Sequence, residues 1–335
     1  MLRFLVTRVS LVIPTFIGVT LLTFALIRLI PGDPIELLVG ERGIDPARHA
    51  ALRAEMGLDQ PLLHQYGIYI WDVLQGDLGR SIVTRQPVLH EFFELFPATL
   101  ELSLCAMLFA LSIGLTAGVI AAVRRNTFFD HTVMGISLTG YSMPIFWWAI
   151  LLILLFSVNL GWTPVSGRID VVYWFDQPTG FMLIDSLLSG QEGAFTSAVR
   201  HLILPAIVLG TIPLAVIARM TRSSMLDVLG EDYVRTARAK GLKERVVIYS
   251  HGLRNGLIPV LTILGLQLGQ LLAGAIIIEN VYYLPGLGRL VFQAIGQRDL
   301  PVVRDIVLFL AAAVVVVNFI VDLVNGAIDP RVRAE

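Results

Sequence analysis

The chain has 335 residues, of which 56% are hydrophobic and only 15% are charged, and its mean hydropathy is +0.75. Soluble domains carry about 25% charged residues, so this composition excludes an ordinary soluble protein and predicts a polytopic membrane protein. The formal net charge of −1 gives no indication of a nucleic-acid partner, and we expect none. Cys105 is the only cysteine, which excludes an internal disulfide.

Six apolar runs reach or approach the ~20 residues that a helix needs to cross ~30 Å of hydrocarbon. The first follows Arg3 and Arg8 as in a signal peptide, but no small-residue cleavage site follows it, so we expect an uncleaved span. Pro205 and Pro213 in the fourth run free backbone carbonyls that neighbouring helices must satisfy, which predicts that this run lies inside the bundle; Pro144 predicts the same for the third. The predicted spans are Val9–Ile30, Ala98–Val123, Thr132–Val158, Leu202–Ala218, Leu257–Ile278 and Ile306–Val324.

The charges of the loops predict the orientation. Loops rich in Lys and Arg stay in the cytoplasm, and here the basic residues lie before span one and after spans two, four and six, whereas the other loops are acidic or balanced. Both termini are therefore expected in the cytoplasm. The residues concerned are Arg3, Arg8, Arg124, Arg125, the segment Glu231–Pro259, Arg331 and Arg333.

The long loop 31–97 is predicted to form a small external cap. Asp45 can cap a first amphipathic helix, Pro46 suits its first turn, and Gly57 can end it. A second helix is predicted over Leu62–Leu74, before a turn at Gly76–Gly79. Turns are also expected in the other long outer loop, Asn159–Arg200, at Gly180, Gly190 and Gly193.

The segment Glu231–Pro259 is the most basic part of the chain, and it lies between spans four and five. Gly241 suits the left-handed position that ends a helix over Tyr233–Lys240 and lets the chain turn into a second helix over Leu242–Leu253. Such a helix pair on the cytoplasmic face is suited to docking a soluble protein; attraction of its basic residues to anionic lipid is the alternative. The apolar side of the second helix is predicted to hold Val246, Val247 and Leu253.

The segment resembles the EAA loop of ABC importer permeases. Its sequence YVRTARAKGL, followed by His251 and by the short motifs LRN and LIP, has the form that is typical of the peptide and nickel branch. The resemblance extends over the whole chain, from MLRFLVTRVSLVIPTFIGVTLLTF through GERGIDPARHA and TGYSMPIFWW to DPR at Asp329–Arg331. Ala237 and Gly241 match the general family pattern. The pattern usually has Glu, Ala and Pro where this chain has Arg235, Thr236 and Arg254, and that departure is shared by the peptide and nickel branch.

The resemblance implies an all-α membrane protein of the bacterial inner membrane with six transmembrane helices and the type I ABC importer permease fold. Residues 1–96 would form the first span and a periplasmic cap, and residues 97–335 a five-helix core with cytoplasmic coupling helices at about 231–256. The implied function is that of a non-catalytic permease subunit in an ATP-driven importer of dipeptides or short peptides. The coupling residues that it implies are Tyr233, Arg235, Thr236, Ala237, Ala239, Lys240, Gly241, Leu242, His251, Arg254 and Asn255.

The same resemblance implies the partners: a paralogous second permease, two ABC ATPase subunits and a periplasmic substrate-binding protein, assembled in the lipid bilayer. This chain would bind no cofactor, because ATP and Mg would sit on the ATPase subunits. Its residues agree, since the only lysines, Lys240 and Lys243, do not follow a glycine and no phosphate-binding loop is present. The six histidines form no zinc pattern.

Polar residues inside spans are candidates for the translocation path, because such groups usually face a bundle interior or a cavity. Gln267, Gln270, Asn318 and Ser142 are the candidates here, and bridging between helices is the alternative role. Gly265 and Gly269 form a G-x-x-x-G that suits close packing, either within the chain or on a second permease. Four residues are expected at an interface or in the core: Glu101 and Asp322 exposed near span ends, and Trp147 and Trp148 as a core or interfacial pair.

Alternative functions have less support in the sequence. A proton-coupled secondary transporter needs carboxylates buried in mid-span, and the six runs show none there. Gly140-Tyr141-Ser142 is similar to the G-x-S of an intramembrane protease, but His201 and His251 are predicted at other depths, so a packing patch is the preferred interpretation. Within the family, oligopeptides, glutathione, haem or nickel remain alternative substrates.

Overall fold

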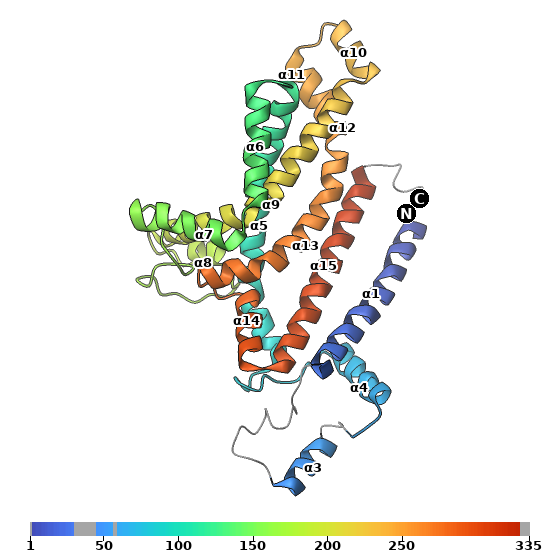
Figure 1. Ribbon diagram of the computed structural model, residues 1–335, viewed down its shortest axis with the longest axis vertical. Helices are drawn as coiled ribbons and strands as arrows, with labels where there is room; N and C mark the ends of the chain where they lie inside the picture. Colours follow the sequence, from blue (N-terminus) through green and yellow to red (C-terminus); the bar gives the residue numbers. More distant parts are fainter. Residues whose placement is uncertain (1, 30–44, 56–58, 329–335) are drawn as a thin grey trace. The chain divides into compact units, whose positions relative to one another are not determined.

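The structure is a computed structural model that describes residues 2–29, 45–55 and 59–328 (Figure 1). Within these ranges the chain is helical, and its only extended pairing is one isolated bridge between Arg80 and Pro87. Gly57, the motif at Asp329–Arg331 and Arg333 lie outside the described residues, as does the side chain of Asp322. The described helices agree with the predicted all-α class.

The chain forms two compact units. The first, called the core unit below, holds Pro97–Arg289 and the chain from Val314 onward; the second, the N-terminal unit, holds Leu2–Phe96 and Leu290–Ala313. Two long helices contribute to both units, α5 (Val88–Val123) and α15 (Leu300–Ile328), and so does the shorter α14 (Leu287–Gln297).

The centre of the core unit is α9 (Ala194–Leu229), which packs on α6 (Phe128–Ser142), on α8 (Met182–Leu188) and on α13 (Ile258–Val281). Pro205 and Pro213 are both buried in α9, which confirms the expectation that this run lies inside the bundle. Its apolar contacts form one cluster with α5 and α13, whose buried members include Leu102, Leu209 and Ile278.

Glycines bring α5 and α9 into close contact. A Cβ at Gly118 would come within 2.6 Å of the Ala218 carbonyl oxygen, and one at Gly210 within 2.6 Å of the Ala106 carbonyl oxygen. The predicted pair on α13 packs within the chain, because a Cβ at Gly265 would meet Asn318 Oδ1 at 3.1 Å and one at Gly269 would meet Val314 Cγ1 at 3.2 Å. Of the two alternatives for this G-x-x-x-G, the structure therefore supports packing within the subunit.

Four described helices are long and apolar enough to cross a membrane, namely α5, α9, α13 and the part of α15 over Leu300–Val321. Helix α1 (Leu2–Leu29) carries a shorter apolar stretch, Val12–Ala25. The number of spans rises to five if the bent pair described next is counted as one. The six-span count stays a prediction.

The third predicted span is not one straight helix. Helix α6 ends at Ser142, and α7 (Ile145–Leu152) with a π-helical turn over Ile153–Asn159 continues at an angle of 108°. Pro144 explains the break, because proline lacks an N–H and forces the preceding residue out of the helical region; Met143 is extended, with φ −79° and ψ 137°. The expectation that Pro144 marks a helix inside the bundle holds for one side of α7, where Ala149 and Leu152 are buried against the core, whereas Phe146, Trp147 and Ile150 on the other side are exposed.

The N-terminal unit contains α1, α3 (Pro46–Glu55) and α4 (Leu62–Gln75). Helix α3 begins at Pro46 and α4 begins at Leu62, as predicted, and positive φ angles at Gly76 and Gly79 confirm the turn that follows α4. The next loop is held by the buried carboxylate of Asp299, which accepts hydrogen bonds from the Ile82 and Val83 amides at 3.2 and 3.3 Å.

Candidate coupling surface and translocation path

The predicted helix–glycine–helix unit is present. Helix α10 (Asp232–Ala239) ends in a turn where Gly241 has a φ of +76°, which confirms the left-handed position predicted for it. The Gly241 amide donates to the Arg238 carbonyl at 2.9 Å and the Leu242 amide donates to the Ala237 carbonyl at 3.4 Å. This pair of bonds is the Schellman arrangement, in which a glycine closes the helix because it has no Cβ to oppose positive φ.

The second half of the unit is longer and less regular than predicted. It runs through α11 (Glu244–Val246), a π-helical stretch over Val247–Leu253 and α12 (Arg254–Gly256), and leads into α13 at Ile258. The second half of the unit is therefore joined to a membrane helix with only Leu257 between them. We refer to residues 232–256 as the coupling element, after the role predicted for them from the sequence.

Apolar contacts fix the coupling element to the end of α9. Val234 and Val247 are fully buried, Ala237 is 6% exposed, and all three pack with Val228 and Leu229 at the end of α9. A second cluster on the same helix pairs Met225 with Ile248. The prediction for Val246 was wrong, because its side chain is 40% exposed and Ile248 is buried in its place.

Glycines and hydrogen bonds complete the attachment. Gly252 and Gly256 lie against Met225, since a Cβ on either would come within 3.0–3.2 Å of that side chain. Ser224 Oγ of α9 donates to the Gly256 carbonyl at 2.8 Å. Within the element, the side-chain amide of Asn255 donates to the Tyr233 hydroxyl at 2.8 Å. This bond connects the two halves across the glycine turn.

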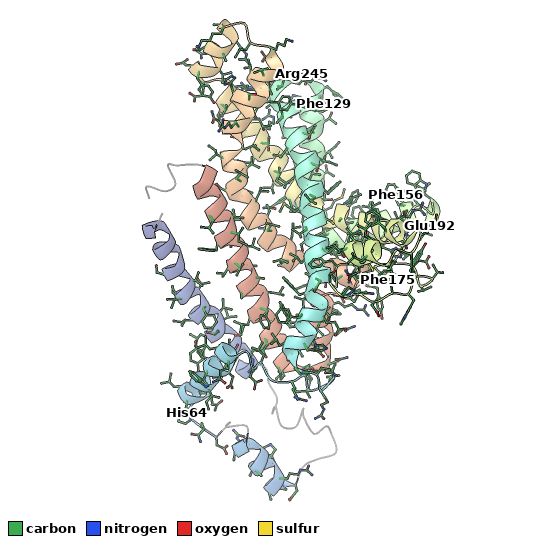
Figure 2. All side chains as sticks on the ribbon, turned by 180° about the vertical axis from the view of Figure 1, so that it is seen from behind. His64, Phe129, Phe156, Phe175, Glu192 and Arg245 are labelled. Atoms are coloured by element: carbon green, nitrogen blue, oxygen red, sulfur yellow. The ribbon has the colours of Figure 1, made fainter. Side chains whose placement is uncertain are left out.

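The outward side of the coupling element is cationic. Arg238 and Glu244 form an ion pair at 2.8 Å, and this hydrogen bond lowers the pKa of Glu244. Four cations are exposed and, in the described part of the chain, have no carboxylate within ion-pair distance: Lys240, Lys243, Arg245 and Arg254. Figure 2 shows Arg245 and Phe129 at one end of the core unit, away from Phe156 and Glu192.

The structure separates the coupling residues named from the sequence into two groups. Ala237 is an internal contact, and Tyr233 and Asn255 bond to each other while remaining exposed. The remaining members are at least partly accessible, and the exposed ones are Arg235, Thr236, Ala239, Lys240, Gly241, Leu242 and Arg254.

An ion pair between α6 and α9 supports this end of the core and was missed in the sequence. Asp130 is 1% exposed, and Arg222 donates to its two carboxylate oxygens at 2.5 and 2.7 Å. Two parallel bonds of this kind fix both distance and orientation. The partners are 92 residues apart, so no local pattern indicated the pairing.

The candidate path residues do not share one environment. Gln267 is 5% exposed, and its Oε1 has no hydrogen-bond partner among the described residues, whereas Gln270 one turn later is exposed. Asn318 faces Gly265 in the contact between α15 and α13. Ser142 is exposed at the end of α6 and donates to the Leu138 carbonyl at 2.9 Å, and no hydrogen bond to a histidine is present in the described part.

The two tryptophans of α7 also lie in different environments. Trp147 is 44% exposed on the outer side of α7, while Trp148 Nε1 donates to Thr211 Oγ1 of α9 at 3.2 Å. Trp148 is thus a core residue, in agreement with one of the two expected roles, and Trp147 is exposed.

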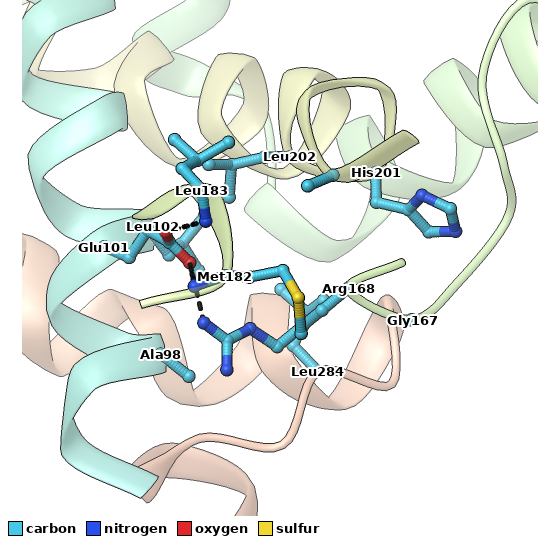
Figure 3. A pocket seen from close by; sticks show the side chains of 11 residues that line it. Ala98, Glu101, Leu102, Gly167, Arg168, Met182, Leu183, His201, Leu202 and Leu284 are labelled. Carbon is cyan, nitrogen blue, oxygen red and sulfur yellow. Dashed lines mark hydrogen bonds and ion pairs between the residues drawn. The ribbon is translucent and has the colours of Figure 1, made fainter. Parts of the chain in front are cut away.

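Glu101 contradicts the expectation of exposure. Its carboxylate accepts a hydrogen bond from Arg168 Nη2 at 2.7 Å and from the amides of Met182 and Leu183 at 3.1 and 2.8 Å, at the start of α8 (Figure 3). The side chains of Glu101 and Arg168 are only 7% and 12% exposed. They line a small pocket together with His201. The sequence missed the pair because 67 residues separate its members.

A second buried carboxylate joins α13 to the following turn. Glu279 is 1% exposed; its oxygens accept from Thr99 Oγ1 at 2.6 Å and from the Arg289 amide at 3.1 Å. A Cβ at Gly286 would lie 2.3 Å from the Glu279 carboxyl carbon, so only glycine allows this close approach. Glu279 and Glu101 are both fully engaged by protein donors, which is the arrangement of structural carboxylates.

Comparisons with known proteins agree with this architecture. Residues 114–334 match the family model described as "Binding-protein-dependent transport system inner membrane component", and residues 1–103 match the model of the N-terminal part of such membrane components. The chain belongs to this family of transport components. It is therefore a multi-pass protein of an inner membrane, as its apolar helices indicate.

Relatives match over nearly the full length. The chain is 62% identical to the di/tripeptide transport system permease protein DppB of Pseudomonas aeruginosa, over 99% of both chains. It is 58% identical to the dipeptide transport system permease protein DppB of Escherichia coli K12, over 99% of both, and 54% identical to that of Haemophilus influenzae, over 99% of this chain and all of the other.

A solved structure shows the same fold. An inward-facing conformation of the MetNI methionine ABC transporter aligns with a TM-score of 0.53 and 20% identity, over 69% of this chain and 93% of the other.

Proposed function

We propose that the chain is the membrane-spanning permease subunit of an ATP-driven importer of dipeptides or short peptides. The observation that carries the proposal is the full-length identity of 54–62% to three proteins named as dipeptide or di/tripeptide permeases. The fold and the accessible cationic surface of the coupling element are consistent with this role.

The proposed partners are a second, paralogous permease, two ATPase subunits that bind ATP and Mg, and a substrate-binding protein outside the membrane. The chain itself makes and breaks no bond in this scheme, because it has no phosphate-binding loop. The exposed members of the coupling element, from Arg235 to Leu242 together with Arg254, would form the surface that an ATPase subunit contacts.

The attachment of the coupling element suggests how motion reaches the membrane. Its first half is packed on the end of α9 through Val234, and its second half leads into α13. Helices α9 and α13 pack against each other. A displacement of the docked surface would therefore act on both helices at once. Closely packed helices move as units between discrete arrangements.

An uptake assay tests the substrate. In a strain that lacks its own dipeptide permeases, expression of this chain with its genomic partners is expected to restore uptake of radiolabelled dialanine. An excess of unlabelled dipeptides should compete, while glutathione, haem and nickel should not. Restored uptake of one of those three, with no uptake of dialanine, would assign the transporter to another branch of the family.

Reporter fusions test the proposed orientation, in which the coupling element lies in the cytoplasm because of its charge. An enzyme that is active only outside the cytoplasm should work when fused near Gln60 or Glu192 and should be inactive near Lys243. Both Gln60 and Lys243 are exposed, so the fusions do not disturb a packed core. Activity at Lys243 would invert the topology.

A further inference from the structure

Helix α4 has three chemically different sides. One side is buried against α1 and carries Tyr66, Tyr69, Ile70 and Val73. A second side is mostly polar, with His64, Asp72 and Gln75 around the half-exposed Ile68. The third side is apolar and exposed, and its members recur at intervals of three to four residues, as a single face of a helix requires: Leu63, Gly67, Trp71 and Leu74.

The exposed apolar side is large for a 14-residue helix. Leu63 is 83% exposed, Leu74 is 67% exposed and Trp71 is 63% exposed. Single apolar residues are common on protein surfaces, but a continuous apolar stripe rimmed by polar residues marks a surface that something covers. Helix α4 contains no Lys, Arg or Glu, so this side offers little to a charged partner.

Contacts within the N-terminal unit place α4 at the end of two membrane helices. The hydroxyl of Tyr66 lies 2.9 Å from Thr20 Oγ1, and Phe24 stacks on Tyr69; both contacts fall in the last part of the apolar stretch Val12–Ala25 of α1. The Arg304 guanidinium lies 4.5 Å from the centre of the Tyr69 ring, in the second turn of α15. Helix α4 thus contacts the last part of the apolar stretch of α1 and the first turns of α15, and Figure 1 shows it beside the lower end of α1.

The surface of α1 beside this crossing is also apolar and exposed, at Ile17, Leu21 and Leu22. In an inner-membrane protein an exposed apolar stretch of this kind lies at the depth of the hydrocarbon. The tyrosine side of α4 contacts α1 at Thr20 and Phe24, next in the chain to these exposed residues, and Trp71 has the amphipathic ring that is enriched where hydrocarbon meets the headgroups.

We propose that α4 is an interfacial helix that lies along the membrane surface, with Leu63, Trp71 and Leu74 immersed among the lipid headgroups and upper acyl chains. His64, Asp72 and Gln75 then face water, and the tyrosine side holds α4 to α1. Such a helix sinks about 5–10 Å below the headgroup boundary. The anchor is separate from the proposed function, because it does not depend on what is transported.

Site-specific quenching tests the proposal. In the full-length protein with Cys105→Ala, a single cysteine is placed at Leu63, at Leu74 or, as the matched control, at Gln75, which lies on another side of the helix from both, and each is labelled with an environment-sensitive fluorophore. The proteins are reconstituted in phosphatidylethanolamine–phosphatidylglycerol vesicles. Lipids with a nitroxide near the headgroup should quench the labels at 63 and 74 at least about twofold more strongly than the label at 75, and a water-soluble quencher should show the reverse order.

Equal quenching of the three labels by the lipid-borne nitroxide would overturn the proposal, because it would mean that the apolar side has no preferred contact with lipid. Labels at 63 and 74 that are shielded from both quenchers would overturn it too, since protein would then cover this side. Two independent apolar positions guard against a label that disturbs one of them, and dialanine uptake is not used in the readout.

Discussion

Replacing Glu101 by alanine is expected to lower the free energy of unfolding of the core unit by about 3–5 kcal/mol, the range for removing one partner of a buried ion pair. The substitution leaves the Arg168 guanidinium buried without its carboxylate and removes the acceptor for the Met182 and Leu183 amides. The start of α8 would lose its attachment to α5. Unfolding by increasing sodium dodecyl sulfate in mixed micelles, followed by tryptophan fluorescence, measures the change.

Two further variants show whether the charge pairing causes the loss. Glu101→Gln keeps one acceptor oxygen and should be destabilised less than Glu101→Ala. The double variant Glu101→Leu with Arg168→Met removes both charges and should be more stable than Glu101→Ala, because no unpaired charge remains buried. A double variant that is less stable than Glu101→Ala would contradict this account.

Replacing Gly241 by valine is expected to abolish transport while the protein still inserts in the membrane. The backbone at Gly241 has a φ of +76°, which costs a residue with a side chain roughly 1–2 kcal/mol and a β-branched residue more. Apart from its chain neighbours, no atom of the described residues lies within 4 Å of the position that a Cβ would take, so the strain comes from the backbone and not from a collision. The turn should open, α10 should tilt, and the surface for the ATPase subunits should be lost.

Co-purification of the ATPase subunits and dialanine uptake measure this effect. Gly241→Asn is the matched control, because asparagine adopts positive φ more readily than other non-glycine residues, and it should retain both properties in large part. Arg80→Ala, an exposed change in the N-terminal unit, should leave ATPase binding intact. If Gly241→Val assembles and transports normally, the segment is not the coupling element, and binding of its basic residues to anionic lipid would replace our interpretation.

Local features of the structure could be predicted well from the sequence. The helix starts at Pro46 and Leu62, the turn at Gly76 and the Schellman glycine at Gly241 all follow from the dihedral preferences of a few neighbouring residues. The break at Pro144 has an equally local cause, yet its 108° angle and the exposure of α7 were not anticipated. A proline indicates that a helix is interrupted, but it does not indicate where the next helix packs.

The sequence by itself determined that the chain is helical and apolar, where most of its membrane helices lie, and that a basic helix–glycine–helix unit separates two of them. These properties depend on contiguous residues, through hydropathy and backbone preference. Only the tertiary structure decided that Glu101 is buried with Arg168, that Asp130 pairs with Arg222, and that Ile248 rather than Val246 packs on α9. Those outcomes depend on which helices meet and on how each helix is rotated about its axis. When the partners are 67 or 92 residues apart, no sequence pattern near either one indicates the pairing.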